Sequence, residues 1–345
     1  MPTTLKDVAA LAGVSLATAS LALNGKQVNS RTRERVEEAA KKLKYHTSAI
    51  GRNLIKNRSN TIGMFILNSK KSRDMTEEIT YYYAMLKGAL DCIRQHGYVF
   101  NFEAVDWEDL EESNYVAKKV FSRSIDGMIL VPQFMYHYSF LSLLEEEGFP
   151  CVVINPNIGI RPKNSAGIDN HRGGYLAADH LLKLGHRNIA IINGPEDHKD
   201  SFDREKGFLA RLLESGIKYD INNNIYSDFT HEGGCRAMKS LLEKKQGLPD
   251  AIFCSNDYMA SGAMAAIFEA GLRVPEDISL VGYDDSDISR CIYPKLTTIR
   301  SPVRELGYLA AERVLEQVVG KKDEADYSMV ELEPELIIRG STRQL

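Results

Sequence analysis

Short apolar runs alternate with longer amphipathic segments from about residue 60 to the end of this 345-residue chain. The runs are typical of buried strands, and the segments between them carry apolar residues at helical spacing. Because parallel strands need a crossover connection, the alternation predicts α/β architecture with parallel sheets. The first series has strands at 61–67, 98–105, 126–132 and 150–155 and helices at 81–97, 114–123 and 140–148.

A second series of the same kind predicts a second, similar lobe. Its strands are expected at 187–194, 224–227, 250–255 and 278–285, and its helices within 167–186 and at 204–215, 233–244 and 257–271. A last helix, 302–319, and a strand, 331–342, are expected to pass back through both lobes. We assign both lobes to one domain, 60–345, with lobe 1 at about 60–160 and 302–328 and lobe 2 at about 161–301 and 329–341.

Polar residues stand at the carboxyl ends of several predicted strands. Asn155 ends one strand, Asn256 and Asp257 follow another, and Asp284 and Asp285 follow a third. Ligands of open α/β sheets bind at such strand ends. Each residue could instead cap a helix or form a turn, but their recurrence favours a polar ligand with many hydroxyl groups.

The first 46 residues predict a separate all-α unit with three short helices. Gly13 permits a sharp turn between the first two because it has no Cβ, and Ser15 and Ser30 are suitable N-caps for the second and third. The helices are expected at 5–11, 16–23 and 31–45. Two short helices joined by a turn and braced by a third make a helix-turn-helix, whose second helix enters the DNA major groove.

The second of these helices is expected to be half core and half contact surface. Its inner face should contain Val14, Ala19 and Leu23, and its outer face should contain Leu16, Ala17, Ser20 and Leu21.

Basic charge is concentrated at the start of the chain. Residues 1–60 contain 11 Lys and Arg against 4 Asp and Glu, so their net charge is +7, whereas the remaining residues carry −11. A basic head on an acidic body is typical of a unit that meets a polyanion, although a solvated charged helix would give the same count.

Residues 47–59 predict a hinge helix or linker. The pattern is short and Gly51 weakens it by roughly 1 kcal/mol. Leu54 is an apolar residue in a basic context, with Arg52 nearby. The segment is either a flexible linker or one that folds on DNA, with Leu54 as a wedge in the minor groove.

The cysteines and histidines do not predict a metal site or a disulfide framework. Histidines on or beside one helix are expected to pack or cap, and we expect buried, inert thiols. These residues are His171, His180, His186, Cys92, Cys151, Cys235, Cys254 and Cys291.

Enzymes and membrane proteins are disfavoured as well. The sequence has no nucleophile elbow, zinc-protease motif or phosphate-binding loop, so we expect no catalytic site and no cofactor. It has no apolar run near the ~20 residues of a membrane span and no segment of secretory type. A cytoplasmic protein is therefore expected.

Motifs of one known pattern are spread over nearly the whole chain. They are TLKDVAALAGVS at 4–15, TASLALN at 18–24, SRTRERV at 30–36, SAIGRNL at 48–54, SNDYMA at 255–260, RVPEDISLVGYDD at 273–285 and PKLTTIR at 294–300. The segment 169–190 follows the same pattern. With these motifs the sequence resembles the lactose-repressor (LacI/GalR) family of bacterial transcription regulators. The resemblance implies a helix-turn-helix headpiece, a hinge helix and a two-lobed, periplasmic-binding-protein-like effector domain.

The resemblance implies that the headpiece and hinge bind double-stranded DNA. Thr47 replaces a usual Pro and Gly51 a usual Ala, so the hinge should depend on DNA for its order. Leu16, Ala17 and Leu21 occupy the main base-reading positions, where they can press on thymine methyl groups but cannot hydrogen-bond a base. The expected DNA-binding residues are Thr4, Ser15, Leu16, Ala17, Thr18, Ser20, Leu21, Asn24, Arg52 and Leu54.

A small-molecule effector between the lobes is also implied. Arg204 and Asp284 would bind vicinal hydroxyls, and Phe229 would cover an apolar sugar face. Ser301 replaces a residue that is often Gln, and the charged connection at 69–80 is longer than usual, so the effector is not named. The expected effector-binding residues are Tyr81, Tyr82, Gln133, Asn155, Arg204, Phe229, Asn256 and Asp284.

The implied working unit is a homodimer on a near-palindromic operator. The last residues, RGSTRQL, lack a heptad tail, so a dimer is expected rather than a tetramer. A periplasmic binding protein has the same lobes, but the basic head and the missing signal segment disfavour it. The effector could release the DNA or favour its binding, and the sequence leaves both open.

Overall fold

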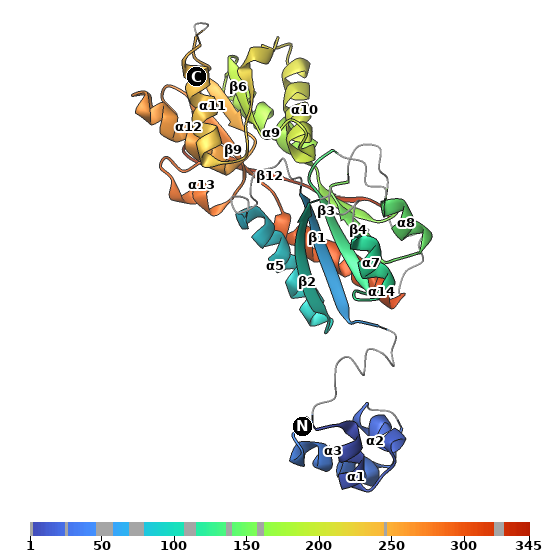
Figure 1. The fold of residues 1–345 in the computed structure, drawn as a ribbon. Coiled ribbons are helices and arrows are strands. Elements are labelled where there is room, and N and C mark those ends of the chain that lie inside the picture. The colour runs from blue at the N-terminus through green and yellow to red at the C-terminus, as the bar shows by residue number, and fades with distance from the viewer. Residues whose placement is uncertain are drawn as a thin grey trace. The chain divides into compact units, whose positions relative to one another are not determined.

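The computed structural model describes residues 3–24, 27–45, 58–68, 79–106, 115–135, 140–156, 162–244, 247–320 and 328–345. The chain divides into two compact units, unit 1 formed mainly by residues up to Asn60 and unit 2 by most of the chain from Thr61 onward. Unit 1 is helical, and strands and helices alternate in unit 2 (Figure 1).

The described part of unit 1 contains three helices, as predicted. They are α1 (Leu5–Ala12), α2 (Leu16–Leu23) and α3 (Ser30–Lys42). Gly13 adopts a φ of +63° between α1 and α2, a conformation that suits glycine. The Ser15 hydroxyl caps α2, since it accepts a hydrogen bond from the Thr18 N–H at 3.1 Å.

The predicted cap of the third helix is wrong by one residue. The Asn29 side chain accepts from the Arg31 N–H at 2.9 Å, and Ser30 is the first helical residue. Asn is as good an N-cap as Ser, so the residue that stands one position earlier captures the free N–H.

The core of unit 1 consists of small apolar side chains. Ala19 is buried, and Val14 and Leu23 pack against the core, as predicted, while Ala22 is a core residue that the prediction omitted. Because alanine and valine bury little area, this core contributes modestly to stability. Its fully packed members are Val8, Ala9, Ala12, Ala19, Ala22, Val36, Ala39 and Ala40.

The described part of unit 2 contains two six-stranded sheets, one in each lobe. Neighbouring strands of the first sheet all pair in parallel. Their spatial order is β11 (Val330–Leu332), β5 (Ser165–Ile168), β4 (Cys151–Ile154), β3 (Gly127–Pro132), β1 (Thr61–Asn68) and β2 (Val99–Asp106).

The second sheet is parallel except at one edge, where β12 is antiparallel to β10. Its spatial order is β12 (Glu335–Ile337), β10 (Thr297–Arg300), β9 (Ser279–Asp284), β8 (Ala251–Cys254), β6 (Ile189–Asn193) and β7 (Asn224–Tyr226). The predicted parallel α/β architecture is thus observed in both lobes.

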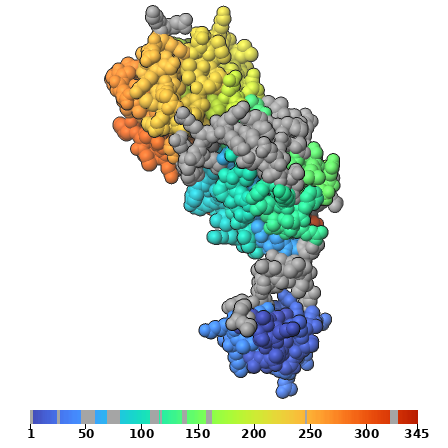
Figure 2. Space-filling model, viewed as in Figure 1, coloured from blue at the N-terminus to red at the C-terminus, as the bar shows by residue number. Residues whose placement is uncertain are grey.

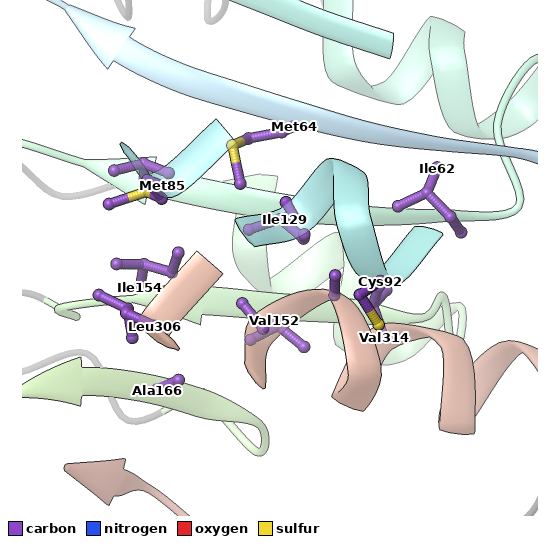
Figure 3. Close-up of a cluster of buried hydrophobic side chains, with 14 of the residues drawn as sticks. Ile62, Met64, Met85, Cys92, Ile129, Val152, Ile154, Ala166, Leu306 and Val314 are labelled. Atoms are coloured by element: carbon purple, nitrogen blue, oxygen red, sulfur yellow. The ribbon is translucent and has the colours of Figure 1, made fainter. Parts of the chain in front are cut away.

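Helices α5 (Ile79–Gln95) and α14 (Val303–Val319) lie side by side on one face of the first sheet (Figure 3). Alternate residues of β1, such as Ile62 and Met64, contact them. The two helices approach closely where Gly307 faces Met85. Glycine permits this contact, since a Cβ on Gly307 would lie only 2.0 Å from the Met85 carbonyl oxygen. The first lobe also contains α7 (Tyr115–Phe121) and α8 (Phe140–Glu146).

Two helix pairs cover the two faces of the second sheet. One pair is α9 (Asn170–Lys183) with α10 (Lys199–Glu214), and the other is α11 (His231–Leu242) with α12 (Asp257–Glu269). A short helix, α13 (Asp287–Cys291), follows β9. In the space-filling view the first lobe is teal to green and the second is yellow to orange, since each is built mainly from one continuous stretch (Figure 2).

The chain crosses between the lobes later than predicted. β5 was assigned to the second lobe, but it pairs with β4 and β11 in the first sheet. The segment 331–342 was expected to form one strand, but it contributes β11 to the first sheet and β12 to the second. Pro334 separates them, because proline lacks the N–H that a continuous ladder needs.

Candidate functional site

Helix α2 presents an exposed apolar surface. Leu16 and Leu21 are 46% and 39% exposed, and Ala17 is exposed between them. The Ser15 and Thr18 hydroxyls lie 2.8 Å apart at the N-terminus of this helix. Its free N–H groups make that end a favourable site for phosphate. Leu16, Ala17 and Leu21 thus lie on the outer face of the helix, as predicted.

Other predicted DNA-binding residues have structural partners. Thr4 precedes α1, and its N–H and hydroxyl donate to the Asp7 carboxylate at 2.8 and 2.7 Å. Ser20 is partly buried rather than fully outward, and Asn24 Nδ2 donates to its carbonyl at 2.8 Å and to its hydroxyl at 3.3 Å. Arg52 and Leu54, and the hinge 47–59 apart from its last two residues, lie outside the described residues.

A cleft with a volume of about 690 Å³ in unit 2 is lined by residues of both lobes, including all eight expected effector-binding residues. Four of these residues stand at strand ends: Gln133 after β3, Asn155 after β4, Asn256 after β8 and Asp284 at the end of β9. Parallel strands that end at one edge of a sheet bring such side chains together.

Arg204, on α10, is held in place from several sides. Its Nε–H donates to Asn170 Oδ1 at 2.8 Å, and its Nη1–H donates to the Ser255 carbonyl at 2.6 Å. The guanidinium lies 3.7 Å from the centroid of the Tyr283 ring, and Nη2 lies 3.7 Å from Asp284 Oδ1. The side chain is 3% exposed, so this cation is fixed before any ligand binds.

Two carboxylates lie near this cation. Burial raises the pKa of Asp284 to about 6, although Arg204 opposes the shift. Asp284 also has a φ of +103°, a strained backbone conformation that aims its side chain. Burial likewise raises the pKa of Asp200, again against the effect of Arg204. Both groups therefore resist carrying charge more than exposed carboxylates do.

Aromatic side chains form another part of the lining. The His198 ring meets the Phe229 ring edge to face, with 5.0 Å between centroids, and Tyr81 meets Tyr82 in the same way at 5.3 Å. Burial, and secondarily the Arg204 cation, lowers the pKa of His198 to about 3. This imidazole is therefore neutral at physiological pH.

The lobes contact each other beside the cleft. Backbone hydrogen bonds join Lys199 N–H to the Gln133 carbonyl at 3.1 Å and Met135 N–H to the Asp197 carbonyl at 3.0 Å. The Asn155 side chain, from the first lobe, donates to Asp200 Oδ1 at 3.0 Å. The N-terminal turn of α10 thus belongs both to the cleft and to the contact between the lobes.

Asn256 lines the cleft and also caps a helix, the alternative role considered for it from the sequence. Its Oδ1 caps α12 by accepting from the Met259 N–H at 2.8 Å, and its Nδ2 donates to the Phe229 carbonyl at 2.8 Å. Neighbouring Asp257 is fully buried and accepts from Thr298 Oγ1 at 2.6 Å.

Sequence reasoning missed Asp200, His198 and Tyr258, which also line the cleft. Asp200 and His198 stand where α10 begins, at Lys199, whereas the predicted helix began at 204. No strand-end position singles them out. An earlier helix start, indicated by the acidic residue in the first turn, could have drawn attention to Asp200.

Among the described residues, no cluster of three or more His, Cys, Asp or Glu could hold a metal ion. His180 and His186 bond to Thr342 and Asp250, as the packing interpretation predicted. Burial raises the pKa of the Cys92 thiol to about 11. Cys291 is exposed, so the expectation of buried thiols is wrong there.

Among the described helices, none alone has the length and hydropathy to cross a bilayer, and α1 with α2 meet that test only as a pair bent by 102°.

Comparison with known proteins gives matches to both units. Residues 4–48 match the family described as bacterial regulatory proteins, lacI family, and residues 178–342 match the periplasmic binding protein-like domain. The HTH-type transcriptional repressor PurR of Klebsiella pneumoniae subsp. pneumoniae is 36% identical over 341 residues, which cover 98% of this chain and 96% of that protein.

Two solved structures are similar over the full length. A lac repressor dimer bound to operator and the anti-inducer ONPF has a TM-score of 0.87 at 28% identity, covering 99% of this chain and 100% of that one. A complex of the transcriptional regulator CelR with cellobiose has a TM-score of 0.73 at 30% identity, covering 98% and 99%. This chain belongs to the lacI family of bacterial regulatory proteins and is a DNA-binding transcriptional repressor, not an enzyme.

Proposed function

We propose that a small polyhydroxylated molecule, most simply a sugar, binds in the cleft of unit 2 and controls the affinity of this repressor for its operator. The observation that carries the proposal is the convergence of Arg204, Asp284, Asn256 and Phe229 on one cleft. Its volume of about 690 Å³ is typical of small-molecule sites. The similar CelR structure contains cellobiose, which supports a carbohydrate.

On the DNA side, α2 enters the major groove. Leu16, Ala17 and Leu21 press on thymine methyl groups, and Ser15 and Thr18 bind phosphates at the helix N-terminus. Two headpieces of a homodimer read the two halves of a near-palindromic operator. The similar lac repressor structure is an operator-bound dimer. The repressor acts in the cytoplasm, where bacterial DNA lies.

Effector binding acts by changing how the lobes meet. Asp285, next to Asp284, accepts from Arg300 at 3.1 Å and from Arg339, and Arg300 also pairs with Glu335 at 3.0 Å. These residues stand where the chain passes between the lobes. A ligand bound to Asp284 is therefore one residue away from the ion pairs of Asp285 at the crossings between the lobes. Because such coupling is reciprocal, operator binding must change the affinity for the effector by the same factor as the effector changes the affinity for the operator.

The test compares ligand-induced thermal shifts of the full-length chain for a panel of sugars, sugar phosphates and nucleobases. Arg204→Ala should abolish the shift while leaving DNA binding measurable by fluorescence anisotropy. Arg211→Ala is the matched control, because Arg211 lies on the same helix but pairs with Asp179 outside the cleft at 2.9 Å. Equal shifts in wild type and Arg204→Ala would show that the ligand binds elsewhere.

A further inference from the structure

Several buried polar atoms of the cleft lining can accept hydrogen bonds from a ligand. The Asp200 carboxylate accepts from Asn155 and keeps further lone pairs. Asp284 Oδ1, His198 Nδ1 and Ser301 Oγ are buried, and no described residue forms a hydrogen bond with any of them. The His198 and Ser301 side chains are only 8% and 7% exposed. Buried polar atoms without partners indicate a ligand that supplies them.

Positive charge, by contrast, is already committed to the protein. Arg204 gives Nε–H and an Nη1–H to neighbouring oxygens, and its Nη2 faces Asp284. Arginines that line the cleft elsewhere are each paired with a carboxylate. The pairs are Arg290 with Asp287 at 3.4 Å, Arg300 with Asp285 at 3.1 Å and Arg304 with Asp91 at 2.8 Å. The described lining contains no lysine.

We infer that the cleft selects against anions: it binds a hydrogen-bond-donating ligand without a phosphate or carboxylate group, so sugar phosphates and sugar acids are excluded. This inference rests on the proposed function. A ligand anion beside Asp200 and Asp284 would meet two carboxylates and a single cation that they already neutralise. Like-charge contacts of this kind are strongly unfavourable, whereas ligand hydroxyls would satisfy the free acceptors.

The neutral state of His198 also disfavours an anionic ligand. Its low pKa, about 3, means that it supplies no positive charge to an anion at physiological pH. It can still accept from a ligand hydroxyl at Nδ1 when the hydrogen is on Nε2.

The experiment separates ligands by charge before their identity is known. A bacterial metabolite extract is passed over a strong anion exchanger, and the unretained fraction and the salt-eluted, desalted anionic fraction are each added to the full-length repressor in a thermal-shift assay. We expect a shift with the unretained fraction only. A shift with the anionic fraction alone, or an equal shift with both, would overturn the inference while leaving the proposed function intact. A shift with neither would overturn the proposed function and the inference with it.

Two variants then test Asp200 itself, using the active compound from the unretained fraction and titration calorimetry. Asp200→Asn should weaken binding about 10- to 100-fold, because one charged acceptor is lost, and Asn can still accept from Asn155. Asp203→Asn is the control: it removes the same charge from the same helix, but Asp203 does not line the cleft. An unchanged dissociation constant in Asp200→Asn, or equal losses in both variants, would overturn the role of Asp200.

Discussion

The surface of α2 and the cleft of unit 2 differ in how exposed their contact residues are and in how firmly these residues are held. The α2 surface is exposed, its contact side chains are largely apolar, and a core of small residues supports it. The cleft is a recess lined by polar and aromatic side chains, and Arg204 is held there by four groups. The first must adapt to a large charged partner, whereas the second is preorganised for a small one.

This difference gives each region its own physical signature. Binding to DNA should depend on salt and on the fold of a small domain, and binding in the cleft should depend on pH and on single hydrogen bonds.

The largest effect should come from the small core of unit 1. Ala9 is 5% exposed and Ala10, the next residue on α1, is exposed. Ala9→Asn should destabilise the headpiece by more than about 3 kcal/mol, because it buries an unpaired amide in a packed core, and should abolish operator binding in a mobility-shift assay. Ala10→Asn should retain binding, and both variants should keep the ligand-induced thermal shift of unit 2. Loss of that shift in Ala9→Asn would contradict the separation.

Salt should act next most strongly, and on one region only. Raising salt from about 50 to 200 mM should weaken operator binding by roughly a thousandfold if six or more phosphates are neutralised. Effector binding, measured by calorimetry over the same range, should change by less than about twofold, since the ligand is uncharged. A comparable salt slope for the effector would place an anion in the cleft.

Acid should weaken effector binding. Asp284, with a pKa of about 6, accepts more strongly from ligand hydroxyls when it is ionised, so affinity should fall by up to about tenfold from about pH 7 to about pH 5. Arg204 does not titrate in this range, and the pKa of His198 lies below it. Asp284→Asn should flatten the calorimetric pH profile.

Protonation of Asp284 does not unfold the protein in acid, so unfolding through this residue cannot account for the weaker effector binding. A carboxyl whose pKa is raised on folding contributes stability that is present in full below its ordinary pKa and is lost as the pH rises through about 6. Asp284 therefore favours the folded state in acid, and a melting temperature at about pH 5 that is no lower than at about pH 7 serves as the control.

The smallest effect concerns single methyl contacts. Leu21→Ala should weaken operator binding about fivefold, because one apolar contact with a thymine methyl is lost. Replacing that thymine by uracil should have a similar effect on wild type and little further effect on the variant. Additive losses in anisotropy titrations would show that Leu21 contacts something else.

Much of the fold follows from periodicity alone. The helical spacing of Val8, Ala9 and Ala12 puts them on one side of α1, where all three are buried, and the run at 126–132 contains the buried strand β3. Three cleft residues, Asn155, Asn256 and Asp284, could be found because strand ends converge in a parallel sheet. Where two local signals competed, as at Asn29 and Ser30, the sequence did not decide between them.

Tertiary structure decided the rest. β5, β11 and β12 have three or four residues each, too few for a periodic signal, so only their partners determine which sheet each one joins. Asp200 and His198 enter the cleft because the start of α10 packs against Gln133 and Asn155 from the other lobe. Contacts between residues so far apart in the chain depend on how the lobes meet, and local sequence patterns do not report that.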